Sequence, residues 1–230
     1  MTAIHADIDA LTEFRAALTR FRYAQREVAD RGGDAVEATR ASLEAKASRW
    51  RARLEQGQAE LTACRDRAAA ADDTPVDCSG YARAVSEAGE RLEHIRHWQQ
   101  RIDDQVIEFH GATSRFKNLL ETDLPRAEEQ LAAIIASLHA TRRVQPPGSL
   151  SVSPVYPVSP GPDRPDRDGD QQLRLLDDAW GKAVPFWQDD IARQFGTHKW
   201  TPLRDESRRY LEALRAMMDL LDAAERDTDY

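Results

Sequence analysis

Two histidines three residues apart are the strongest candidates for chemistry in this 230-residue chain. His94 and His97 follow Glu90 and Glu93, and two imidazoles at this spacing share one side of a helix, where they can bind a metal ion. The nearby apolar residues repeat on the opposite side, so we expect these four side chains to face solvent. The sequence therefore predicts neither a metal site nor a cofactor here.

No motif of a familiar catalytic type is present. The sequence contains no Glu-x-x-His pair of the di-iron bundles, no Gly-rich phosphate loop, no Gly-x-Ser-x-Gly and no His-Glu-x-x-His. The remaining histidines are scattered, and His110 flanks an apolar seam. We predict no catalytic residue and a chain that is not an enzyme, with an enzyme whose site lies in a bundle core as the third hypothesis.

Cys64 and Cys78 are the two cysteines of the chain, and they form no metal or redox motif. In an antiparallel helical hairpin these two positions come near each other if the intervening loop folds back. Two interpretations stay open at this point: a disulfide bond that closes a short loop, or two buried free thiols in a reducing cytoplasm.

Composition and charge exclude several classes of protein. The chain is 41% hydrophobic and 31% charged, with a net charge of −8 and interspersed signs. Because nucleic-acid binding needs a clustered basic surface, we expect no nucleic-acid partner. No apolar run approaches the roughly 20 residues of a membrane span, and the N-terminus does not resemble a secretory signal. A cytoplasmic location follows as the expectation, with export by a route independent of a signal peptide kept open.

The proline distribution divides the sequence. Seven of the 11 prolines fall between Pro146 and Pro165, a density that no helix tolerates. We predict a Pro-rich linker at 144–170 between a helical bundle at 1–143 and a helical hairpin at 171–230. The preference for Arg over Lys favours a bacterial source.

The N-terminal segment has the heptad pattern of a coiled coil. Apolar residues recur at alternating steps of three and four, which predicts narrow seams between long helices. Gly32 and Gly33 are expected to end the first helix, Gly57 to accept the ring of Trp98, and Pro125 to cause a kink or a short break at 122–125. The expected fold is all-α, an elongated antiparallel three- to four-helix bundle with coiled-coil character. Its predicted helices are 4–31, 35–70, 80–121 and 124–142.

The C-terminal segment predicts a second, smaller hairpin with many large rings. Gly196 is expected to end its first helix, and Thr201 to cap the last one. A hairpin of this size cannot bury so many rings by itself. Either they pack on the N-terminal bundle, or they anchor a protein partner or a second copy. The candidate protein-binding residues are Trp180, Phe186, Trp187 and Trp200.

The same segment resembles the helical hairpins of the WXG100 (ESAT-6-like) family of type VII secretion. Two amphipathic helices, the Trp180–Gly181 pair and tryptophans near the turn carry the resemblance, although the expected turn reads Phe195–Gly196 and lacks the family's Trp-x-Gly. The resemblance implies a substrate or partner of a secretion system. Our first hypothesis is a non-enzymatic helical interaction protein, an adaptor, spacer or chaperone-like subunit of a bacterial assembly, and the secretion role is the alternative.

Overall fold

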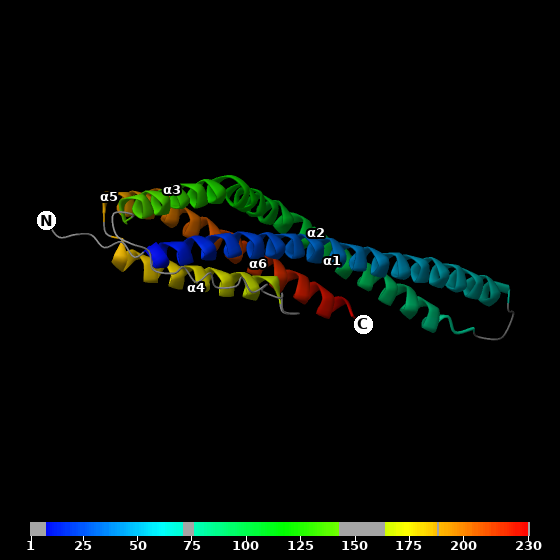
Figure 1. Ribbon diagram of the computed structural model, residues 1–230. Helices are drawn as coiled ribbons and strands as arrows, with labels where there is room; N and C mark the ends of the chain where they lie inside the picture. The colour runs from blue at the N-terminus through cyan, green and yellow to red at the C-terminus, as the bar shows by residue number, and fades with distance from the viewer. Residues whose placement is uncertain (1–7, 71–75, 143–163, 188, 230) are drawn as a thin grey trace. The chain divides into compact units, whose positions relative to one another are not determined.

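The structure, a computed structural model, describes residues 8–70, 76–142, 164–187 and 189–229, and over these residues the chain is all-α without a strand (Figure 1). The fold class predicted from the heptads is confirmed. The helical elements are α1 (Ile8–Ala70), α2 (Ser79–Asn118), η1 (Leu119–Asp123), α3 (Leu124–Arg142), α4 (Pro165–Ala183), η2 (Val184–Phe186), α5 (Asp190–Phe195), η3 (Gly196–Trp200) and α6 (Thr201–Thr228).

The contacts divide the chain into two compact units that share long helices. Unit 1 contains Met1–Gly33 and Glu108–Met218, and unit 2 contains Asp34–Ile107 and Asp219–Tyr230. Each unit is described by itself below.

The predicted break at Gly32 and Gly33 is wrong, because α1 is one continuous helix of 63 residues. A Cβ atom added to Gly32 would lie 2.7 Å from Cδ1 of Leu214, whereas one added to Gly33 would meet nothing within 4 Å. Gly32 therefore allows α6 to approach α1 closely. Tertiary packing of this kind outweighs the helix-propensity cost of a glycine, which is about 1 kcal/mol.

Unit 2 is built on an antiparallel hairpin of the α1 and α2 segments (Figure 1). The predicted seams are confirmed within it, since the α1 seam residues from Leu43 to Ala68 and the α2 seam residues from Tyr81 to Val106 are buried or half-buried. The predicted contact of Gly57 with Trp98 is wrong, because the nearest atom to a Cβ at Gly57 is Cγ2 of Val85, at 3.1 Å.

A disulfide bond between Cys64 and Cys78 joins the two helices near the tip of this hairpin. The Cα atoms lie 5.9 Å apart, and the bond closes a loop with a sequence separation of 14 residues. Of the two interpretations left open by the sequence, the structure contains the bridge. It fixes the end of α1 to the start of α2.

Unit 1 is a helical bundle in which α4, α5 and α6 pack with the first part of α1 and with the end of α2 and α3. Its core includes Tyr210 of α6, whose ring stacks on Phe116 of α2 with centroids 4.3 Å apart. Burial raises the pKa of the Tyr210 hydroxyl well above its ordinary value. The C-terminal helices therefore complete a core that they share with residues from the N-terminal half of the chain.

Part of the predicted linker is helical. Pro165 is the first residue of α4, where its missing N–H costs no intrahelical hydrogen bond, so residues 165–170 belong to a helix and not to a linker. The rest of the predicted range, up to residue 163, lies outside the described residues, and the division of the chain at this linker stays a prediction.

Candidate functional site: a pocket between two π-turns

A π-helical turn precedes Pro125. In η1 the N–H of Leu124 donates to the carbonyl of Leu119, five residues back, and Pro125 follows directly. The wider turn adds one residue to the helical repeat, which relieves the clash of a proline ring with the preceding turn. Of the two alternatives expected at 122–125, the short break is wrong, because the chain stays helical from α2 through η1 to α3, and the kink stays a prediction. The π-turn takes up the one-residue shift of the apolar seam.

A second π-turn, η3, repeats this arrangement before Pro202. The N–H of Thr201 donates to the carbonyl of Gly196, and the Thr201 hydroxyl donates to the same carbonyl at 3.0 Å. Gly196 does not end a helix, and Thr201 is not an N-cap, because α5, η3 and α6 are continuous from Asp190 to Thr228. Both predictions failed because Gly196, a residue type that often ends a helix, here begins a π-turn that continues the helix.

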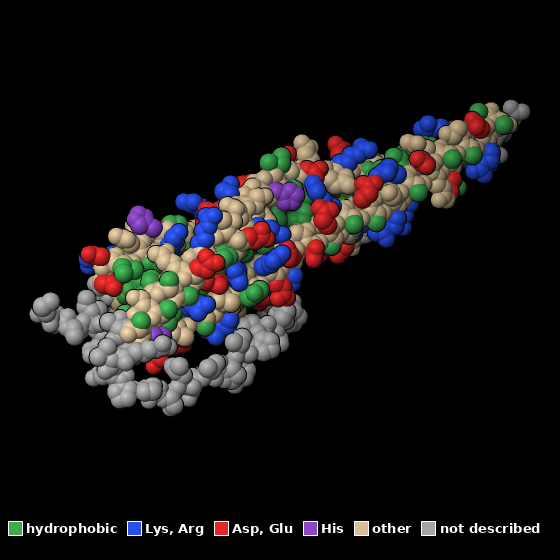
Figure 2. Space-filling view, turned by 45° about the horizontal axis from the view of Figure 1, so that its top comes forward, with side chains coloured by type: hydrophobic (Ala, Val, Ile, Leu, Met, Phe, Trp, Pro, Cys, Tyr) green, Lys and Arg blue, Asp and Glu red, His purple; other side chains and the backbone are tan. Residues whose placement is uncertain are grey.

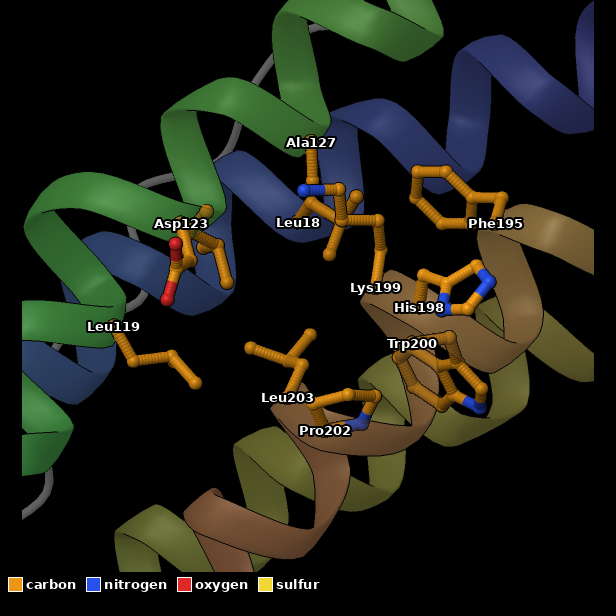
Figure 3. Close-up of a pocket in the computed structure, with 11 residues that line it drawn as sticks. Leu18, Leu119, Asp123, Ala127, Phe195, His198, Lys199, Trp200, Pro202 and Leu203 are labelled. Atoms are coloured by element: carbon orange, nitrogen blue, oxygen red, sulfur yellow. The ribbon is translucent and has the colours of Figure 1, made fainter.

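The two π-turns line the same pocket, which has a volume of about 140 Å³ and lies wholly within unit 1 (Figure 3). Leu119 and Leu203 point toward each other from η1 and α6, and Leu18 of α1 forms another side. π-Turns are rare and occur often at functional sites. The full lining is Leu18, Leu119, Asp123, Leu124, Ala127, Phe195, His198, Lys199, Trp200, Pro202 and Leu203.

A cluster of five aromatic rings supports the pocket from inside the unit. Trp180 of α4 contacts the other four rings, and Phe14 of α1 has its ring centroid 5.1 Å from that of Trp180 and 5.8 Å from that of Trp200. Trp180 stacks on Trp200 at 5.2 Å, and Trp187 lies 5.5 Å from Phe195. Because rings at these distances lock one another's orientation, Phe195 and Trp200 present fixed surfaces to the pocket.

The four predicted protein-binding residues therefore have different positions. Trp187 and Trp200 are 2% and 5% exposed and are core residues of the aromatic cluster, in which Trp200 contacts Phe14 of α1 and Trp187 contacts Trp180 and Phe195. Trp180 is half-buried in the same cluster. Of the four, only Phe186 in η2 is an exposed residue, with 50% of its surface accessible. Whether any of the four binds a partner stays a prediction.

The helical spacing of apolar residues does not continue through Pro185. Val184 and Ile191 follow the spacing of Trp180, Trp187 and Phe195 in the sequence, yet they are 38% and 47% exposed. Pro185 converts residues Val184–Phe186 to a 3₁₀ turn, after which Asp189 caps α5 by accepting a hydrogen bond from the N–H of Ala192 at 2.7 Å. Because the 3₁₀ turn changes the rotation of the chain between α4 and α5, the apolar faces of these two helices do not form one continuous face.

Charged groups form the rim of the pocket. Lys199 is half-buried, and its side chain extends from η3 across the pocket toward α3 (Figure 3). His198 is exposed beside it. Asp123 is exposed, and its Oδ1 lies 4.0 Å from Nη1 of Arg126, three residues further along the chain. Lys199 makes no ion pair with any residue that the structure describes.

The histidine pair lies elsewhere, on α2 in unit 2. His94 and His97 are both exposed, as the seam predicted, and His94 Nε2 accepts a hydrogen bond from Trp98 Nε1 at 3.2 Å. Among the described residues, no group of three or more His, Cys, Asp or Glu side chains is placed to hold a metal ion. In the same part of the chain, no helix has the length and apolar character needed to cross a bilayer.

The pocket itself was not predicted from the sequence. Its lining comes from three regions far apart in the chain, around Leu18, around Leu119–Ala127 and around Phe195–Leu203. Two features of the sequence accompany the π-turns. The apolar seam shifts by one residue between Leu120 and Leu124, before Pro125, and Phe195 and Trp200 are five residues apart before Pro202. A pattern of this kind, a proline just after an extra residue in the helical repeat, marks both sides of the pocket.

Comparison with known proteins gives a likeness of fold. No known protein family matches the chain, and no characterised protein matches it in sequence. The chain is similar in structure to the haptoglobin–hemoglobin receptor of Trypanosoma congolense, with a TM-score of 0.57 and 16% identity over 99% of this chain and 91% of that chain. At this identity the similarity shows a shared all-α bundle architecture.

Proposed function

We propose that the chain is a non-enzymatic helical interaction protein, which acts as an adaptor, spacer or chaperone-like subunit of a multi-protein assembly and contacts its protein partner at the π-turn pocket. The observation that carries the proposal is the pairing of two rare π-turns around one apolar pocket with a charged rim. A pocket flanked by charge is a typical anchor point of a protein interface.

Two further observations support a protein partner. Figure 2 shows basic and acidic side chains intermixed over the face in view, which does not offer the single-sign surface of a nucleic-acid binder. The protein of similar structure is, by its name, a receptor for haptoglobin–hemoglobin. We take protein binding as the corresponding role here, without carrying over that receptor's ligands.

Affinity purification from cells that produce the protein tests this function. Ala127 is 6% exposed and lines the pocket from α3, so Ala127→Leu fills it, whereas Ala133 is exposed on the same helix and gives the matched control Ala133→Leu. The proposal expects a partner that co-purifies with the wild type and the control but is lost with Ala127→Leu. Identical sets of proteins with all three would overturn it.

The Cys64–Cys78 disulfide favours a second candidate function. Disulfides persist in oxidising compartments and are rare in the reducing cytoplasm. We infer that an exported protein, a substrate or partner of a type VII-like secretion system, is the alternative that best fits the bond, in place of the cytoplasmic location. Cell fractionation with thiol alkylation tests this: export predicts unalkylated protein outside the cells, and fully alkylated protein retained inside would contradict it.

A further inference from the structure

We propose that the π-turn pocket takes a single large apolar side chain from a partner protein, and that Lys199 binds an acidic residue beside this anchor. The inference rests on the proposed function and adds the chemistry of the partner segment to it.

The size of the pocket limits what it can hold. Its volume of about 140 Å³ is close to that of an engineered apolar cavity of about 150 Å³ that binds benzene. Pockets for cofactors and drug-sized ligands are larger, roughly 300–1,000 Å³. A group the size of a leucine or phenylalanine side chain therefore fits, and the rest of its carrier stays outside.

The chemistry of the walls requires that group to be apolar. Leu119, Leu124 and Leu203 are all buried, and they line the pocket together with Leu18 and Phe195. A charged or strongly polar group placed among these side chains would lose its hydration without gaining a hydrogen bond. Any charge on the partner has to remain at the rim.

The rim favours a negative charge on the partner. The Asp123 carboxylate is already within 4.0 Å of the Arg126 guanidinium, whereas the Lys199 ammonium has no counterion among the described residues. Lys199 is half-buried over the apolar lining, where solvent screens its charge less than at a fully exposed position. A carboxylate next to the apolar anchor would supply the missing counterion and fix the orientation of the partner.

A phage-displayed library of random 12-residue peptides, selected on the immobilised full-length chain, tests the proposal. Enriched peptides are synthesised, and their dissociation constants are measured by fluorescence polarisation. The proteins compared are the wild type, Ala127→Leu, Lys199→Glu, Lys199→Arg and the control Ala133→Leu, each checked for helicity and thermal unfolding so that lost binding is not lost folding.

The expected peptides carry a large apolar residue with Asp or Glu within four positions. We expect binding about tenfold weaker or worse with Ala127→Leu and with Lys199→Glu, near wild-type binding with Lys199→Arg and Ala133→Leu, and recovery on Lys199→Glu when the peptide's acidic residue is changed to Lys. Peptides that lose affinity with Ala127→Leu but ignore every change at Lys199 would overturn the charge pairing and leave the proposed function standing. Peptides indifferent to Ala127→Leu would overturn the pocket as the anchor site.

Discussion

Gln25 and Gly169 lie 144 positions apart in the sequence, and the Gln25 Nε2 donates a hydrogen bond of 2.8 Å to the backbone carbonyl of Gly169. Gln25 is fully buried on α1. The absence of a side chain at Gly169 lets α4 come close enough for this bond, since a Cβ there would lie 2.3 Å from Cδ2 of Leu211 and 3.4 Å from the Gln25 Oε1. The contact joins α1, α4 and α6 within unit 1.

Replacing Gly169 by alanine should therefore destabilise unit 1. Overpacking costs about 1–3 kcal/mol, which exceeds the gain of about 1 kcal/mol from better helix propensity. Gly181→Ala on the same helix is the control, because nothing lies within 4 Å of its added Cβ, and it should stabilise slightly. Urea unfolding measures both, and a Gly169→Ala protein as stable as Gly181→Ala would contradict the close approach.

The adjacent glycines of α1 provide a second matched pair. Gly32→Ala should lower the free energy of unfolding, because its Cβ would overlap Cδ1 of the fully buried Leu214. Gly33→Ala should raise it by about 0.5–1 kcal/mol. Thermal unfolding with circular dichroism compares the two; equal shifts in the same direction would mean that Gly32 has no packing role.

The tryptophan positions lead to a prediction that separates core from surface. Trp187→Ala and Trp200→Ala should each lower stability by about 3–5 kcal/mol, because both rings are buried and pack against Trp180. Phe186→Ala should change it by no more than about 0.5 kcal/mol. If the tryptophan variants unfolded at the same midpoint as the wild type, the two rings would not be core residues. The hypothesis that they anchor a partner would then be favoured.

Reduction of the disulfide should lower the stability of unit 2. A bond that closes a loop of this length contributes about 3 kcal/mol by the chain-entropy model. We expect faster amide hydrogen exchange near Cys64 and Cys78 with reductant present. Mass spectrometry with alkylation before and after reduction checks the bond itself, and two cysteines alkylated without reductant would show that it is absent.

The seams of the long helices could be predicted from the sequence, because alternating steps of three and four leave little choice of buried face. Leu92, Ile95 and Ile102 are all buried as that pattern requires. The helix ends were less predictable. Glycines such as Gly32 and Gly196 often end helices. Tertiary contacts at Gly32 and a π-turn at Gly196 keep the helix continuous, and neither can be predicted from the neighbouring residues alone.

The pocket could not be predicted from the sequence for a related reason. A heptad pattern assigns each residue to the inside or outside of a helix, but it does not say which helices meet or where a π-turn shifts their register. Lys199 and Leu119 are 80 positions apart, and only the folded bundle places both at one pocket. The prolines at 125 and 202 were visible in the sequence, whereas their common π-turn geometry was not.

Site-specific photo-crosslinking tests the central claim most directly. A benzophenone amino acid is placed at His198, on the exposed rim of the pocket, or as a control at Ile107, which is 76% exposed in unit 2. Illumination of producing cells should crosslink one defined partner protein at position 198, and Ala127→Leu in the same chain should abolish this product. No product at 198, or the same product from both positions, would contradict the assignment of this pocket as the partner-binding site.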